Sequence, residues 1–185
     1  MTTERRAAMV VDTRVCVGCS ACALACKAEN DTPEGFARSW IVKETRGTFP
    51  DLHLRILSER CMHCSDAPCV SACPTGASHY AEDGTVLVHR DLCTGCGACV
   101  TSCPYDARFM HPDGYADKCT LCYHRTSRGQ EPACVEVCPT GALTYGDLND
   151  PSSPVRELLR TRDHGVLQPE AGTRPNMFFL TPDGE

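Results

Sequence analysis

Alternating apolar and polar positions predict one extended segment in this chain. The stretches "SWIVKETRG" and "DLHLRIL", within residues 39–57, follow the period of two that is typical of half-buried strands. Two such runs in succession predict a β-hairpin. A further short strand is expected in "GTVLVHR", residues 84–90, which begins at an Asp-Gly turn.

Helix signals are few. Lys27, not proline, follows Cys26, so the segment "ALACKAEND" can continue as a helix. Ser153-Pro154 is a plausible helix start, and "VRELLR" behind it is the one short helical stretch expected after the last cysteine. The tail "GTRPNMFFL" is expected to be irregular with an apolar end. Packing against its own domain and docking on a partner both remain open for it.

No apolar run has the length of a targeting or spanning segment. Arg5 and Arg6 stand near the N-terminus, but no apolar stretch of seven residues follows before Cys16, so a signal peptide is not expected. No segment approaches the roughly 20 apolar residues that cross a bilayer. We therefore expect a chain that is soluble by itself and peripheral to a membrane only through a partner.

Composition argues against a large apolar core. The 185 residues include 16 cysteines, 14 glycines and 13 prolines, and only 6% are aromatic. Something besides apolar burial must therefore stabilise the fold. The formal charge of -6 gives no reason to expect nucleic-acid binding.

The cysteines fall into four sequence groups of four. Groups one and three have gaps of two, two and three residues, whereas group two has gaps of two, four and three, and group four has gaps of two, eleven and three. In order, the groups are Cys16, Cys19, Cys22 and Cys26; Cys61, Cys64, Cys69 and Cys73; Cys93, Cys96, Cys99 and Cys103; and Cys119, Cys122, Cys134 and Cys138.

Three other uses of cysteine fit this spacing poorly. In a disulfide framework, cysteines two residues apart seldom pair, and small secreted folds scatter their cysteines more evenly. Structural zinc draws two CxxC pairs from separated loops, whereas here a third cysteine follows after two more residues. Covalent haem attachment requires CxxCH, and no cysteine in the chain precedes a histidine.

The spacing matches the bacterial ferredoxin run C-x2-C-x2-C-x3-C-P, in which three cysteines hold one [4Fe-4S] cubane and the fourth reaches a neighbouring one. Gly18, Gly95 and Gly97 permit the positive-φ turns that wrapping a cubane needs. A proline follows the last cysteine in groups two, three and four, and it ends the run and redirects the chain. These prolines are Pro74, Pro104 and Pro139.

Internal repetition predicts the architecture. Segment 67–80 aligns with 132–145, and 16–26 aligns with 93–103. The fold expected is α+β, with duplicated bacterial ferredoxin-like modules built around iron-sulfur clusters, an inserted hairpin and an irregular C-terminal tail. The four-cluster domain is expected over 1–146, with the insert at 36–60, and a partner-docking extension over 147–185.

The whole chain resembles the four-cluster electron-transfer subunit of membrane-bound molybdopterin oxidoreductases, of the polysulfide, thiosulfate, tetrathionate and dimethyl sulfoxide reductase type. The motifs that carry the resemblance are "CVGCSACALACKAEN", "CMHCSDAPCVSACPTGA", "CGACVTSCPYDARFMHP", "DKCTLCYHR" and "PACVEVCPTGAL". In that family the subunit bridges a molybdopterin catalytic subunit and a multi-helix membrane subunit that handles quinol.

The resemblance implies four ligand sets, which spacing alone leaves open. Because Cys96 occupies the position where one relative carries a different residue and a [3Fe-4S] centre, four [4Fe-4S] clusters are expected. The first set is Cys16, Cys19, Cys22 and Cys138; the second is Cys26, Cys119, Cys122 and Cys134; the third is Cys61, Cys64, Cys69 and Cys103; the fourth is Cys93, Cys96, Cys99 and Cys73.

Electron transfer is the expected function. A globule of this length has a radius of gyration of about 16 Å, which a chain of four one-electron centres divides into shorter steps. No Ser–His–Asp set, phosphate loop or carboxylate pair indicates catalysis by this chain. A formate dehydrogenase or hydrogenase partner and a free polyferredoxin remain as alternatives. The resemblance favours the extracytoplasmic face of the membrane, with the cytoplasmic face as the alternative.

Some charged residues lie near the cysteines in sequence. For Lys27, Arg108, Lys118 and Arg125, solvated surface charge is the simpler interpretation, and tuning of cluster potentials or partner contact is the other. His63, between Cys61 and Cys64, is expected to be a packing residue behind the ligands, with no role as a ligand.

Overall fold

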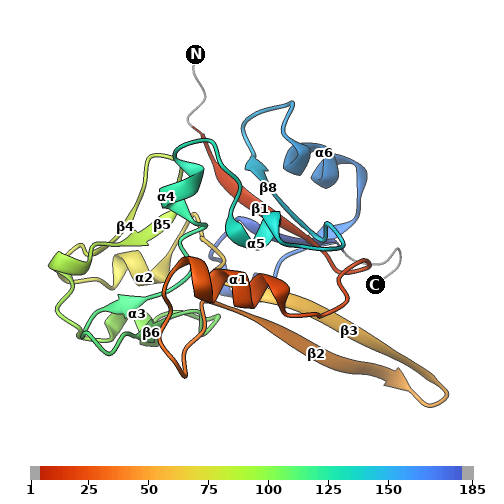
Figure 1. The fold of residues 1–185 in the computed structure, drawn as a ribbon, viewed down its shortest axis with the longest axis horizontal. Helices are drawn as coiled ribbons and strands as arrows, with labels where there is room; N and C mark the ends of the chain where they lie inside the picture. Colours follow the sequence, from red (N-terminus) through yellow and green to blue (C-terminus); the bar gives the residue numbers. More distant parts are fainter. Residues whose placement is uncertain (1–4, 181–185) are drawn as a thin grey trace.

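The computed structural model describes residues 5–180, and it is an α+β fold of short elements (Figure 1). The strands are β1 (Ala7–Asp12), β2 (Ser39–Thr48), β3 (Asp51–Arg60), β4 (Ser78–Tyr80), β5 (Val86–Val88), β6 (Phe109–Met110), β7 (Ala116–Asp117), β8 (Leu143–Asp147), β9 (His164–Gly165) and β10 (Met177–Leu180). The helices are α1 (Ala21–Glu29), α2 (Pro68–Ser71), α3 (Ala98–Thr101), α4 (Tyr123–Thr126), α5 (Ala133–Glu136) and α6 (Pro154–Thr161), with 3-10 turns η1 (Arg90–Leu92) and η2 (Pro169–Ala171).

One four-stranded sheet joins the two ends of the chain, in the order β8-β1-β10-β9. Strand β1 runs antiparallel to β8, with Met9 opposite Tyr145, and parallel to β10, with Met9 opposite Met177. The apolar run Ala7–Val11 is buried along its whole length, as expected for a strand covered on both faces. Helix α6 packs against one face through Val155, and the other face belongs to the core that contains the cysteines.

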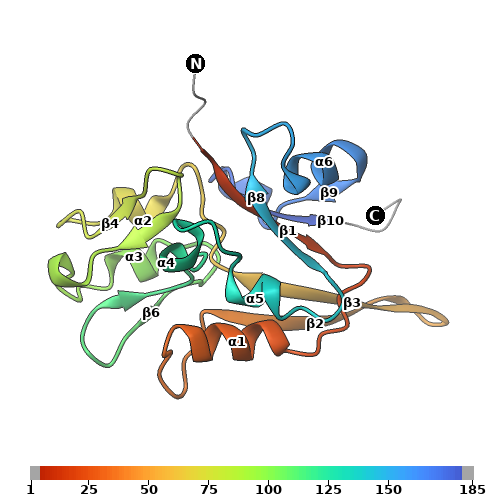
Figure 2. The same cartoon turned by 45° about the horizontal axis from the view of Figure 1, so that its top comes forward.

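The predicted hairpin is present as β2 and β3. Its register runs from Ser39 opposite Arg60 at the base to Thr48 opposite Asp51 at the tip. The base is buried in the domain, whereas the tip projects from it, and Phe49 there is 86% exposed (Figures 1 and 2). The hairpin therefore has one end that packs beside the cysteines and one end that faces outward.

The cysteine-bearing helices are short. Helices α2, α3 and α5 have four residues each and carry one buried cysteine, namely Cys69, Cys99 and Cys134. Helix α1, which no proline interrupts, continues through Cys22 and Cys26 to Glu29. The helices contact each other in pairs, α1 with α5 and α2 with α3, as the duplicated modules predict. The α+β class is therefore confirmed.

The C-terminal segment differs from the expectation. Residues 177–180 are not irregular but form β10, inside the same sheet as β1. Four apolar residues pair there because β1 offers them an unfilled edge, which a local reading of "NMFFL" cannot reveal. The expected helix near 155–160 is α6, and the strand expected within 84–90 is limited to Val86–Val88. Residues 181–185 of the predicted extension lie outside the described part.

None of the helices that the structure describes has the length and apolar character that crossing a bilayer requires.

Candidate metal centre

None of the sixteen cysteines is in a disulfide, so a disulfide framework does not hold this fold. Within residues 5–180, no three His, Cys, Asp or Glu side chains converge closely enough to hold a single metal ion. A cubane is larger than one ion and separates its four thiolates more widely. The arrangement of the thiols must therefore be compared with such a larger group.

The loop of group one wraps a small enclosed space. Cys16, Cys19, Cys22 and Cys138 line one cavity together, and burial next to the other three thiols raises the pKa of Cys16. Gly18 turns this loop with a φ of 64°. A Cβ atom on Gly18 would lie 3.0 Å from Cε of Lys43 and 3.1 Å from Cγ2 of Ile56, so the hairpin covers this loop closely.

A second gathering of thiols surrounds Cys26. Burial raises the pKa of Cys26, and the neighbouring thiols Cys119, Cys134 and Cys122 raise it further. All four are buried. Helix α1 thus delivers its second cysteine to the thiols of group four while its first remains with group one.

A third gathering surrounds Cys64. Burial raises the pKa of Cys64 to about 11, and Cys61, Cys69 and Cys103 contribute to the same shift through their charge. Of these four, only Cys103 is partly exposed. The first three cysteines of group two therefore lie near the last cysteine of group three.

Of the remaining four thiols, Cys93 and Cys96 lie on the loop of group three, Cys99 lies in α3, and Cys73 follows the end of α2. Helix α2, which precedes Cys73, contacts α3, which contains Cys99. Gly95 turns the loop with a φ of 68°, and a Cβ atom there would lie 2.5 Å from the carbonyl oxygen of Gly114. This position therefore requires glycine both for its conformation and for its space.

Backbone N–H groups are directed at several sulfurs. Ser78 donates to Sγ of Cys73 at 3.3 Å, Ala116 to Cys93 at 3.4 Å, and Leu121 to Cys119 at 3.4 Å. Burial raises the pKa of Cys73, but hydrogen bonds from Ser78 and its neighbours outweigh it and leave the pKa lowered. Such donors stabilise the thiolate, which is the form that binds iron.

Two basic side chains lie buried against thiols. Arg60 is 1% exposed and donates from Nη1 to Sγ of Cys134 at 3.0 Å. Arg108 is 4% exposed and donates from Nη2 to Sγ of Cys69 at 2.9 Å. Nε of both residues, and Nη1 of Arg108, are buried with no protein acceptor. Buried donors require partners, so these atoms fit an anionic group held between the thiols, as an iron-sulfur cluster would be.

The solvated-charge interpretation is wrong for Arg108 and Lys118. Lys118 is 1% exposed, and its Nζ donates to the carbonyl oxygens of Val86 and of Cys119, the latter at 2.7 Å. Arg125, by contrast, is at the surface in ion pairs with Glu29, at 2.9 Å, and with Glu136.

Lys27 is half-buried, and its Nζ donates to backbone carbonyls of Pro33 at 2.8 Å and Phe36 at 3.1 Å.

Arg60 was not predicted from the sequence. The available signal is its position directly before the first cysteine of group two, which matches that of Lys118 before group four.

His63 is fully buried, in agreement with the predicted packing role. Its Nδ1 accepts the N–H of Val86 at 3.2 Å. Burial lowers the pKa of His63, and the charges of Lys118, Arg108 and Arg60 lower it further. The ring is therefore neutral at physiological pH.

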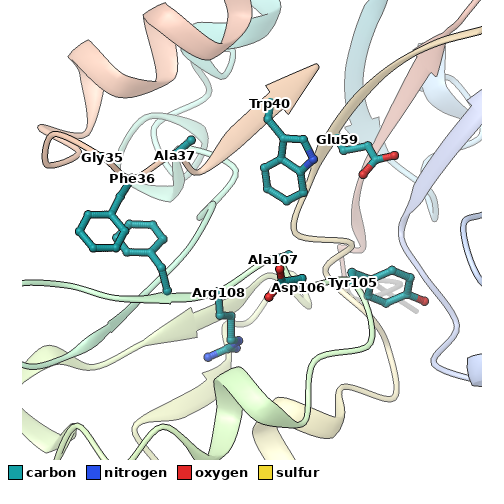
Figure 3. A pocket seen from close by; sticks show the side chains of 10 residues that line it. Gly35, Phe36, Ala37, Trp40, Glu59, Tyr105, Asp106, Ala107 and Arg108 are labelled. Atoms are coloured by element: carbon teal, nitrogen blue, oxygen red, sulfur yellow. The ribbon is translucent and has the colours of Figure 1, made fainter. Parts of the chain in front are cut away.

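A surface pocket of about 450 Å³ lies beside the third gathering of thiols (Figure 3). Trp40 and Glu59, at the hairpin base, line one side, and Tyr105 and Arg108 line another. Burial raises the pKa of Tyr105, and the charges of Cys64 and Cys103 raise it further. The guanidinium of Arg108 points away from Trp40 in this view, consistent with its bond to Cys69.

Two family models, both described as "4Fe-4S dicluster domain", match this chain over residues 52–148 and 15–78. "Protein NrfC" of Escherichia coli (strain K12) is 46% identical over 94% of this chain and 79% of its own length. A tetrathionate reductase subunit of Salmonella typhimurium is 43% identical over 97% of this chain and 74% of its own length. A polysulfide reductase chain of Wolinella succinogenes is 42% identical over 93% of this chain and 92% of its own length.

Proposed function

Because the chain belongs to the 4Fe-4S dicluster family, we propose that it conducts electrons through four [4Fe-4S] clusters between two partner subunits. The clusters would be held by the first set (Cys16, Cys19, Cys22, Cys138), the second (Cys26, Cys119, Cys122, Cys134), the third (Cys61, Cys64, Cys69, Cys103) and the fourth (Cys93, Cys96, Cys99, Cys73).

Family membership confirms the predicted cofactor, because two dicluster domains carry four [4Fe-4S] clusters and the sixteen cysteines match that number. It also confirms an electron-transfer role rather than a catalytic one, since relatives are named as chains or subunits of reductases. When bound, the clusters supply one-electron chemistry, and the protein positions them and tunes their potentials.

Chain connectivity supports a linear order of the sets. Helix α1 carries Cys22 of the first set and Cys26 of the second. Cys119 of the second set and Cys61 of the third are electrostatic neighbours. Helix α3 and the residues after it carry Cys99 of the fourth set and Cys103 of the third. The sets therefore follow one another in the order first, second, third, fourth.

The observation that carries the proposal is the exposure of the two ends of this series. Cys19 in the first set and Cys96 in the fourth are exposed, whereas seven of the eight cysteines in the second and third sets are buried. The loop that enters α1 and the helix α3 also lie at opposite sides of the molecule (Figures 1 and 2). A conductor between two partners needs this arrangement, with access at each end and insulation between.

One partner would be a molybdopterin catalytic subunit and the other a multi-helix quinol-handling membrane subunit. Two of the relatives are named as parts of a tetrathionate reductase and of a polysulfide reductase, which supports a complex of the sulfur-compound reductase type. The chain would be peripheral to the membrane through these partners, on the extracytoplasmic face.

Anaerobic affinity purification from detergent-solubilised membranes, followed by metal analysis, tests the proposal. We expect molybdenum or tungsten, a large subunit, a multi-helix membrane protein and about sixteen irons per copy of this chain, as four cubanes require. Nickel in place of molybdenum would assign the complex to the hydrogenase class. Recovery of this chain with its iron but without partners would exclude the bridging role.

A further inference from the structure

Arg60 lies between the first and second ligand sets. Its Nη1 donates to Cys134 of the second set at 3.0 Å, and its Nη2 donates to the hydroxyl of Ser58. The Ser58 hydroxyl is in turn 3.4 Å from Sγ of Cys22, which belongs to the first set. The charge of Arg60 thus reaches sulfurs of both sets from a fully buried position.

Lys118 occupies the equivalent place between the second and third sets. It directly precedes Cys119 of the second set, and its charge also acts on Cys61 and Cys69 of the third. Its side chain is 1% exposed, and its Nζ donates to the carbonyl oxygens of Val86 and of Cys119, the latter at 2.7 Å, so the ammonium group lies in the interior beside the second set.

Arg108 lies between the third and fourth sets. Its Nη2 donates to Cys69 of the third set at 2.9 Å and to the hydroxyl of Ser78 at 2.8 Å. Its Nε and Nη1 have no protein acceptor, and the charge of Cys99 of the fourth set raises the pKa of Arg108. The structure thus places one buried cation at each of the three junctions in a series of four sets.

We propose that Arg60, Lys118 and Arg108 are junction cations, each of which raises the reduction potentials of the two clusters on either side of it. This inference rests on the ligand sets of the proposed function. Reduction adds one negative charge to a cluster, and a fixed positive charge nearby stabilises the reduced form in a buried, weakly screened site. A series of anionic clusters would otherwise repel the electrons that it must carry.

Surface cations near the clusters should not act in this way. Arg125 lies three residues after Cys122, but it is at the surface and its charge is offset by Glu29 and Glu136. Water and salt screen such a charge. Arg125→Met is therefore a matched control for Arg60→Met, because both substitutions replace the same cation near the second set.

The experiment measures the reduction potentials of all four clusters by EPR in the full chain with clusters assembled. Arg60→Met is expected to lower two of the four reduction potentials by at least about 59 mV. For one electron, this shift is a tenfold change in the ratio of reduced to oxidised cluster. Arg108→Met should lower the other two. Lys118→Met should lower one potential from each of these pairs, and Arg125→Met should lower none to this extent.

The test needs no assignment of EPR signals to individual clusters, because it depends only on which of the variants lower the same potentials. The proposal is overturned if Arg60→Met shifts no potential further than Arg125→Met does, or if every variant shifts all four potentials alike. Arg60→Lys separates charge from hydrogen-bond geometry, and it should keep both potentials near their original values. A fall as large as that of Arg60→Met would contradict the proposed role of charge.

Failure of the proposed function gives a different result. If the unaltered chain holds far fewer than about sixteen irons or shows fewer than four reducible centres, the ligand sets themselves are wrong. If Arg60→Met does not retain its iron, Arg108→Met and Lys118→Met carry the same test at the other two junctions, with the same expected overlap.

Discussion

The proposed inner ligand sets (second and third) and outer ligand sets (first and fourth) differ in their surroundings although their sequence motifs are alike. The second and third sets have seven buried cysteines among eight, whereas the first and fourth have two, Cys22 and Cys99. Two buried arginines, Arg60 and Arg108, donate to sulfur in the inner sets, at Cys134 and Cys69. The outer sets lie on glycine-turned loops and each includes an exposed cysteine.

This difference follows from how the helices cross between modules. In the proposed sets, the last cysteine of each run joins three cysteines of another run, so burial of one run affects two sets. Arg60 at the hairpin base and Lys118 contact residues of the inner sets, whereas each outer set includes one cysteine that is exposed to solvent. One repeated motif therefore provides both buried and partly exposed cysteine sets, according to its position in the fold.

Removal of all iron should have the largest effect. Helices of four residues cannot persist alone, so we expect loss of cooperative unfolding when a strong chelator strips the clusters under argon. Circular dichroism during heating measures this. The same chelator saturated with iron is the control, and an unchanged melting temperature in the stripped chain would contradict the cluster-dependent fold.

Loss of one inner ligand should destabilise the chain more than loss of one outer ligand. Cys134→Ala leaves the guanidinium of Arg60 buried without its sulfur partner, and breaking such a buried pair costs about 3–5 kcal/mol. Cys19→Ala removes an exposed thiol from an outer set. Iron content and denaturant midpoints of both variants test the difference, and equal losses would argue against the distinction between inner and outer sets.

Alanine substitutions at two glycines of the group-three loop allow the effect of backbone strain to be measured apart from the effect of steric overlap. Gly95 and Gly97 both have positive φ, with values of 68° and 74°, so alanine at either costs roughly 1–2 kcal/mol. Only at Gly95 would the new Cβ meet backbone, the Gly114 oxygen at 2.5 Å, whereas nothing lies within 4 Å at Gly97. Gly95→Ala should therefore lose stability and fourth-set iron, and Gly97→Ala should lose less. The reverse order in a thermal melt would refute this account of the loop.

The smallest effect is expected at the surface ion pair of Glu29 with Arg125. Hydrogen bonds from His124 and Arg125 lower the pKa of Glu29, but the site is open to water. Glu29→Gln should lower the melting temperature only slightly in dilute buffer and not at all near 1 M salt, where charges are screened within about 3 Å. The cluster potentials that Arg60 and Arg108 are proposed to raise should, in contrast, change little with salt. If the melting temperature of Glu29→Gln fell equally at low and high salt, the Glu29–Arg125 pair would behave as a buried interaction, which would contradict this prediction.

Local patterns predicted the parts of the fold that local chemistry determines. Cysteine spacing indicated the four clusters, alternation predicted the hairpin, and Ser153-Pro154 marked the start of α6. Strand β10 was missed because its four residues become a strand only through pairing with β1, about 170 residues earlier in the chain. Arg60 was missed for a similar reason. An arginine at the end of a strand usually faces solvent, and only the packed hairpin base places it beside Cys134.

Exposure of the reduced clusters is the most direct test of this account. A water-soluble dysprosium complex speeds the electron-spin relaxation of centres near the surface, so pulsed EPR of the fully reduced chain, free of partners, reports which clusters it can approach. We predict strong enhancement for two of the four clusters and weak enhancement for the other two, and the same two should lose their enhancement when partner subunits are bound. Equal enhancement of all four clusters would contradict a conductor with two accessible ends and a buried middle.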